Sequence, residues 1–129
     1  MAKNFKKYLG IDWGEKRIGL ASADSETKLA LPFKTVSNLL ELISVISAEE
    51  IDCLVLGYPR KMSGEQADNP NWQIFVDQLK KQVDIPIVFL DERLSSLAAD
   101  ALGKKNKAKA GRDEIAAALI LQNYLDGAR

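Results

Sequence analysis

The sequence predicts one α/β domain, spanning residues 1–129, in which a mixed β-sheet carries helices on both faces. Three observations predict this class. The first third of the chain alternates short apolar segments with turn-forming residues, which is typical of strands. The remainder alternates apolar runs with segments of helical periodicity, as in sheets covered by helices. A length of 129 residues suffices for one hydrophobic core but not for two ordinary lobes.

The first three elements are predicted to be strands. YLGID (8–12) and RIGLASAD (17–24) flank the turn-like WGEK and should form a hairpin. LALPFKTV (29–36) is predicted as a third strand. Pro32 within it lacks a backbone N–H, so this strand should lie at an edge or contain an irregularity.

The next segment, 37–50, is predicted to be a helix. Ser37 is the candidate N-cap, since its side-chain oxygen can accept a hydrogen bond from the first helical turn. The apolar residues recur at helical spacing, namely Leu39, Leu42, Ile43 and Ile46.

The second half alternates buried strands with helices. The predicted elements are strand 51–58, helix 72–83, strand 85–92, helix 94–103 and helix 112–127. The two strands are continuous apolar runs, which is typical of strands covered on both faces. Because helices separate them, we expect the strands to run parallel.

The composition excludes several kinds of chemistry. The chain has no histidine, so Ser-His-Asp and Cys-His catalysis and histidine metal ligands are excluded. Cys53 is the single cysteine and lies in an apolar run, where a buried, unreactive side chain is the expected role. Carboxylates and oxygen-bound metals remain, and these favour Mg²⁺ or Mn²⁺.

The net charge of zero does not indicate a nucleic-acid partner, but the distribution is uneven. Between residues 93 and 112 there are six basic residues and one acid, a local charge of +5. This segment fits either a solvated loop or a nucleic-acid contact. No run approaches the roughly 18 apolar residues that span a membrane. We therefore expect a cytoplasmic protein without a signal peptide.

Three acids occupy positions where strands and helices meet. Asp12 ends the first apolar strand, on the same face as Gly10, which leaves space beside it. Glu92 stands at the end of the strand 85–92, and only one of Asp91 and Glu92 should face a site. Asp113 opens the last helix, where small residues permit close packing on the sheet.

Each acid also has a structural explanation by itself. Asp12 could cap a turn, and acids near a helix start offset the helix dipole. Together, however, three carboxylates could hold one or two divalent cations. Two cations about 4 Å apart can activate a water and stabilise the leaving oxygen of a phosphodiester.

Four motifs, taken in order, resemble the YqgF/RuvX family of Holliday-junction-resolvase-like proteins, whose members are also described as nucleases of precursor 16S ribosomal RNA. The motifs are LGIDWGEKRIGLASAD, LVLGYPRKMSG, FLDERLSS and DEIAAALILQNYLD, which together cover nearly the whole chain. The resemblance implies a ribonuclease H-like fold with a five-stranded mixed sheet. It also implies a catalytic, metal-binding acid in three of the motifs, matching Asp12, Glu92 and Asp113.

The resemblance also indicates substrate-binding residues. Arg17 and Arg93 match family positions, and Arg17 is expected to support the site or contact phosphate. Further phosphate contacts are predicted in two loops, at Arg60, Lys61, Lys104 and Lys105. The chain departs from the family pattern at Tyr58 and has a shorter interval between Glu92 and Asp113. These departures concern substrate binding and specificity more than the metal site.

Four functions are compatible with these features. The first is an Mg²⁺- or Mn²⁺-dependent endonuclease that matures the 5′ end of precursor 16S rRNA, alone or on the pre-ribosome. The second is a Holliday junction resolvase on branched DNA, which would act as a homodimer rather than a monomer. The third is a non-catalytic nucleic-acid or ribosome-binding module. An actin-like phosphotransferase is disfavoured, because that class needs two lobes.

Overall fold

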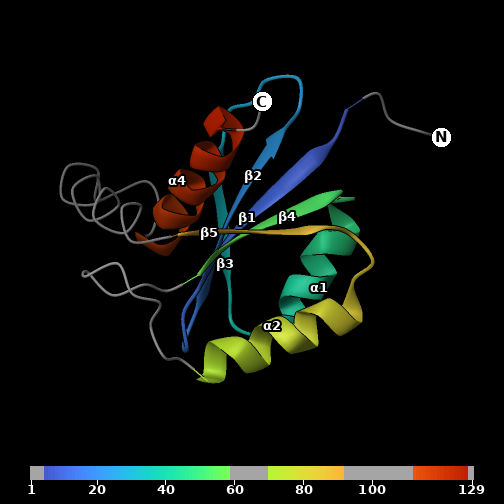
Figure 1. Ribbon diagram of the computed structural model, residues 1–129, viewed down its shortest axis with the longest axis vertical. Coiled ribbons are helices and arrows are strands. Elements are labelled where there is room, and N and C mark those ends of the chain that lie inside the picture. Colours follow the sequence, from blue (N-terminus) through green and yellow to red (C-terminus); the bar gives the residue numbers. More distant parts are fainter. Residues whose placement is uncertain (1–4, 59–69, 92–111, 128–129) are drawn as a thin grey trace.

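The computed structural model describes residues 5–58, 70–91 and 112–127 (Figure 1). Five strands form one mixed sheet in the order β3-β2-β1-β4-β5. The strands are β1 (Lys7–Trp13), β2 (Ile18–Asp24), β3 (Leu31–Val36), β4 (Cys53–Tyr58) and β5 (Ile87–Asp91). The described helices are α1 (Leu39–Ala48), α2 (Pro70–Gln82) and α4 (Arg112–Gly127).

The strand directions agree with the predictions. β1 pairs with β2, and β2 with β3, in antiparallel orientation, while β4 is parallel to both β1 and β5. β3 is an edge strand, as Pro32 indicated, and its register with β2 shifts between Leu20 and Ala21. The parallel pairs bring the carboxyl ends of β1, β4 and β5 to one edge of the sheet, where sites gather in such folds.

Helices cover both faces, so the core has two layers. The α1–α2 face contains the larger apolar cluster, which includes Leu9, Ile11, Leu54 and Leu56 together with Trp72 and Phe75 of α2. The other face packs against α4 through Ala21, Val55, Ala117, Ile120 and Leu121. Figure 1 shows α4 on the opposite side of the sheet from α1 and α2. Alternate residues of the strands serve the two layers.

Local details differ from the sequence predictions in two places. The N-cap of α1 is Asn38 and not Ser37, because the Asn38 side chain accepts the hydrogen bond from the Glu41 N–H at 2.9 Å. α2 begins at Pro70, two residues before the predicted start, at a position where the missing N–H of proline costs little. The predicted helix 94–103 lies outside the described residues.

No helix in the part of the chain that the structure describes is long and apolar enough to cross a membrane. Cys53 is buried, which agrees with the role predicted for it, and Trp72 of α2 is buried as well.

Candidate active site

Asp12 lies near the carboxyl end of β1 on the face that α4 covers. Its neighbours Leu9 and Ile11 belong to the opposite layer, whereas Tyr8 packs with the α4 cluster. Because strand side chains alternate, Gly10 and Asp12 share the face of Tyr8. The Asp12 side chain is partly buried. A partly buried carboxylate at a strand end suits a binding role better than a core role.

Gly10 does not leave an open space beside Asp12, because α4 occupies it. A Cβ at Gly10 would lie 2.7 Å from the Ala117 carbonyl oxygen and 2.7 Å from the Leu121 Cβ. The close approach expected of the small residues in this helix is therefore confirmed at Ala117. The absence of a side chain at Gly10 lets α4 contact the sheet directly.

A second close approach brings Asp113 to Asp12. Gly19 of β2 pairs with Asp12 of β1 in the antiparallel register. A Cβ at Gly19 would overlap the backbone carbonyl of Asp113 and approach its Cβ to 2.7 Å. Since directly opposed Cα atoms lie only about 4.5–5.5 Å apart, the backbone of Asp113 packs against the cross-strand neighbour of Asp12. Sequence reasoning missed Gly19, although its place opposite Asp12 follows from the hairpin register.

Arg17 makes an ion pair with Asp113. The Arg17 Nε lies 2.9 Å from the Asp113 Oδ2. The Arg17 side chain is 69% exposed and the Asp113 side chain 23% exposed. The guanidinium therefore reaches the carboxylate from the solvent side, and most of it stays in water.

The turn before β2 fixes the position of the Arg17 backbone. The Gly14 N–H donates to the Arg17 carbonyl oxygen at 2.9 Å, which closes the hairpin. The neighbouring Glu15 accepts a hydrogen bond at 2.9 Å from the Asn71 side chain of α2. Trp13 packs toward the α2 layer, with its ring 6.0 Å from that of Phe75. The hairpin tip is thus packed against α2, which covers the face of the sheet opposite α4.

Glu114, the next acid in α4, has a different partner. The Thr35 hydroxyl of β3 donates to the Glu114 Oε2 at 3.1 Å. Further along the helix, the Gln122 side chain accepts from the Ala30 N–H at 2.9 Å and donates to the Lys28 carbonyl oxygen at 3.1 Å. These contacts fix the orientation of α4, and they leave Asp113 as the acid of its first turn that lies over Gly19.

The remaining predicted site residues lie outside the described residues. They are Glu92, Arg93, Arg60, Lys61, Lys104 and Lys105. The described part of β5 ends at Asp91, immediately before Glu92. Leu90 packs in the α4 layer, and side chains two positions apart share a face of a strand. The assignment of Glu92 to the face of Asp12 stays a prediction based on this alternation.

The donor set fits a hard divalent cation in its chemistry. Asp12 and Asp113 supply carboxylate oxygens, which Mg²⁺ and Mn²⁺ accept. Within residues 5–58, 70–91 and 112–127, no group of three or more acidic, cysteine or histidine side chains is close enough together to hold a metal ion. Two carboxylates are thus the part of the predicted metal site that the described residues contain.

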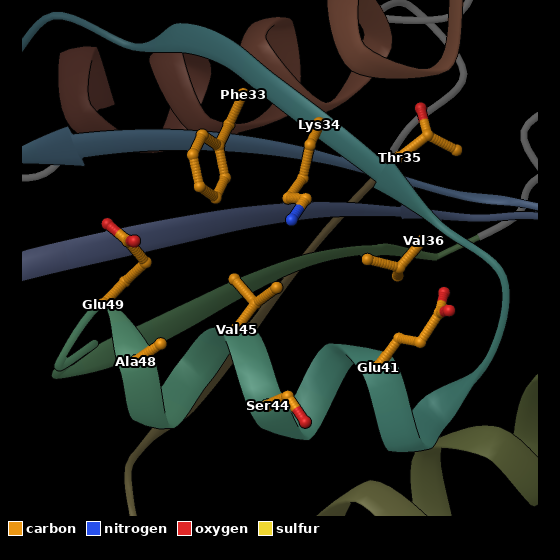
Figure 2. Close-up of a pocket in the computed structure, with 9 residues that line it drawn as sticks. All are labelled: Phe33, Lys34, Thr35, Val36, Glu41, Ser44, Val45, Ala48 and Glu49. Atoms are coloured by element: carbon orange, nitrogen blue, oxygen red, sulfur yellow. The ribbon is translucent and has the colours of Figure 1, made fainter.

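A separate groove of about 420 Å³ lies between β3 and α1 (Figure 2). Figure 2 shows Lys34 and Val36 of β3 facing Val45 of α1 across it. The groove belongs to the α1–α2 face, away from Asp12. Its acids have structural partners, because Glu41 accepts from the Ser37 N–H at 2.6 Å and Glu49 pairs with Lys7 at 3.4 Å. We therefore do not assign chemistry to this groove.

Residues 6–127 match the family model of RuvX, which is described as a Holliday junction resolvase. The chain belongs to the RuvX family. Its similarity to individual RuvX relatives extends over almost the full length. A protein of Roseiflexus sp. (strain RS-1), named "Putative pre-16S rRNA nuclease", is 36% identical, and the match covers 95% of this chain and 96% of that protein. A protein of the same name from Phocaeicola vulgatus is 37% identical, with 93% and 95% covered.

Solved structures show the RuvC-like, ribonuclease H-like fold. The chain is similar to Thermus thermophilus RuvC in complex with a Holliday junction substrate, with a TM-score of 0.60 and 13% identity, covering 96% of this chain and 98% of that one. It is also similar to the fowlpox virus Holliday junction resolvase, with a TM-score of 0.56 and 12% identity, covering 93% and 98%. The predicted fold class is therefore confirmed, including the five-stranded mixed sheet.

Proposed function

We propose that this RuvX protein is a metal-dependent endonuclease that hydrolyses phosphodiester bonds in the 5′ maturation of precursor 16S rRNA. The observation that carries the proposal is the packing of Asp113 against Gly19, the cross-strand partner of Asp12, near the sheet edge where β1, β4 and β5 end. The names of the relatives from Roseiflexus and Phocaeicola support RNA as the substrate. We further propose that residues 1–129 form one domain.

In the proposed reaction, Asp12 and Asp113 hold Mg²⁺ or Mn²⁺ together with Glu92. The bound metal would supply a lowered pKa for the attacking water and stabilisation of negative charge on the phosphate. The carboxylates are fixed by β1 and by the docked first turn of α4, so little reorganisation is needed on substrate binding. Arg17, Arg60, Lys61, Arg93, Lys104 and Lys105 are proposed to contact backbone phosphates, which position a strand without reading its sequence.

The test compares RNA and DNA substrates in one experiment. A labelled precursor 16S rRNA fragment and a four-way DNA junction are each incubated with Mg²⁺, Mn²⁺ or EDTA. The proteins are wild type, Asp12→Asn and Asp113→Asn, with Glu114→Gln as a matched control, since Glu114 is the neighbouring acid of α4 and accepts a hydrogen bond from Thr35 of β3.

We expect the wild type and Glu114→Gln to cut the RNA with metal but not with EDTA. Loss of a metal ligand should lower the rate by more than about 100-fold, the upper range for changes in outer-shell partners. Binding that persists in all variants without any cleavage would instead identify a non-catalytic nucleic-acid-binding module.

Junction resolution is the second candidate function. It is favoured by the family description and by the fold shared with the RuvC complex. Paired, symmetric cuts in the junction, with the RNA left intact, would establish this activity in place of RNA maturation. A resolvase should also be dimeric during cleavage, whereas the RNA nuclease can act as a monomer.

A further inference from the structure

Arg17 and a metal ion have the same target, the carboxylate of Asp113. We propose that Arg17 is a positioning residue that serves as the exchangeable counter-ion of Asp113 and passes to a substrate phosphate when a divalent cation takes its place. The inference rests on the proposed function of the same site. It adds a second role for Arg17, whose guanidinium would leave Asp113 for a substrate phosphate where the site holds a cation.

The contact geometry carries the first half of this inference. The Arg17 Nε lies 2.9 Å from the Asp113 Oδ2, and the Arg17 side chain is 69% exposed. An ion pair with one largely exposed partner contributes little, because water solvates the free guanidinium almost as well. The guanidinium can therefore leave Asp113 at small cost. While it stays, it compensates a partly buried negative charge in the first turn of α4.

The surroundings of the two residues carry the second half. The backbone of Asp113 is fixed over Gly19, so the carboxylate cannot follow the guanidinium when the pair opens. The backbone of Arg17 is fixed by the Gly14 turn, so the released side chain remains beside the strand ends. A guanidinium freed there offers paired N–H donors that match phosphate oxygens.

The test measures cation binding without nucleic acid. Mn²⁺ is titrated into the full-length wild type, Arg17→Ala and Arg17→Lys, and free Mn²⁺ is followed by electron paramagnetic resonance. Lys16→Ala is the matched control, because it removes the same charge from the same exposed turn, one residue from the ion pair. Asp12→Asn identifies the specific site by its loss of binding.

We expect Arg17→Ala to bind Mn²⁺ about two- to fivefold more tightly than wild type, the factor that corresponds to an exposed ion pair. Lys16→Ala should change the affinity less, and Arg17→Lys should fall between wild type and Arg17→Ala. Thermal unfolding gives a second readout. Arg17→Ala should melt below wild type without metal, and this difference should disappear at saturating Mn²⁺, whereas a purely structural ion pair would keep it.

Steady-state cleavage of the RNA tests the transfer to phosphate. Arg17→Ala should raise KM about two- to fivefold and leave kcat within about twofold, as for an interaction made equally in the ground and transition states. If wild type cuts RNA and binds Mn²⁺ but Arg17→Ala binds it no better than Lys16→Ala does, the counter-ion role is wrong and the nuclease assignment stands. If wild type neither binds Mn²⁺ nor cuts, both proposals are overturned.

Discussion

At the scale of single residues, Gly19 has the strictest structural requirement near the proposed site. Its Cα pairs with that of Asp12, and the backbone of Asp113 fills the space where a side chain would stand. Any larger residue must push the first turn of α4 away from the sheet. The distance between the two proposed metal ligands therefore depends on the absence of one Cβ.

Gly19→Ala should consequently impair both stability and cleavage. We expect the free energy of unfolding to fall by about 1–3 kcal/mol, the usual cost of overpacking, and cleavage to fall with it. Denaturant unfolding and the RNA assay measure the two effects. Gly127→Ala is the matched control, since a Cβ at Gly127 meets nothing within 4 Å. Equal stability and activity in the two variants would contradict the close approach.

Cys53 gives a prediction about pH. Burial raises the pKa of the Cys53 thiol above its ordinary value of 9.0. Two smaller effects act on the same pKa, which Lys6 lowers and Asp52 raises. The unfolded thiol ionises near pH 9.0 while the folded thiol stays neutral, so the stability of the folded state falls as the pH rises above 9.0. Unfolding free energies of wild type and Cys53→Ala, measured from pH 7 to 10, should show a larger fall in wild type, because the raised pKa of Tyr124 acts in both proteins near pH 10.

Sequence reasoning at this scale identified side-chain types but not their partners. The alternation in YLGID correctly placed Asp12 opposite Leu9 and Ile11, because the period of a strand is fixed by its backbone. The ion pair of Arg17 with Asp113 joins residues 96 positions apart, and no local pattern encodes it. Ser37 and Asn38 are both good caps, so the choice between them depended on how the chain leaves β3.

At the scale of elements, α4 packs the C-terminal part of the described chain against strands from its N-terminal part. Its apolar face packs on β1, β2 and β4, and its polar side chains bind β3 and the segment before it. The sequence predicted the helix and its small residues. It did not predict that α4 would pack directly on Gly10 and Gly19, because which residues lie side by side depends on the hairpin register.

Leu121→Ala should show how strongly the packing of α4 on the sheet stabilises the fold. Leu121 is fully buried and its Cβ faces Gly10, so truncation leaves a cavity that the backbone cannot easily close. We expect a loss of about 2–5 kcal/mol in the free energy of unfolding, measured with urea. Leu40→Ala is the control, because Leu40 is 77% exposed, and it should lie within about 0.5 kcal/mol of wild type.

At the scale of the whole molecule, charge is balanced in number but not in position. The chain has 18 basic and 18 acidic residues, so attraction for nucleic acid must arise from a local excess. The predicted excess lies in residues 93–112, of which only Arg112 belongs to the described part of the chain. Its role in binding therefore remains a prediction from the sequence.

Replacing Lys104 and Lys105 by Gln should weaken RNA binding in a salt-dependent way. Each phosphate contact that is lost should lower the slope of log K against log salt by about 0.7–0.9. Fluorescence anisotropy between low and moderate salt measures that slope. Replacing Lys80 and Lys81, two exposed lysines of α2, changes the net charge equally and should leave the slope unchanged. Equal slopes for both double variants would assign binding to net charge alone.

The packing of α4 on the sheet also has a consequence for how the protein folds during its synthesis. Asp12 leaves the ribosome early, but its partner Asp113 and the helix that covers Ala21 and Val55 follow about a hundred residues later. Because chains emerge from the N-terminus first, the nascent sheet has one uncovered apolar face and lacks Asp113, one of the three proposed metal ligands. A nascent polypeptide that has not yet folded α4 onto the sheet should therefore lack the proposed cleavage activity.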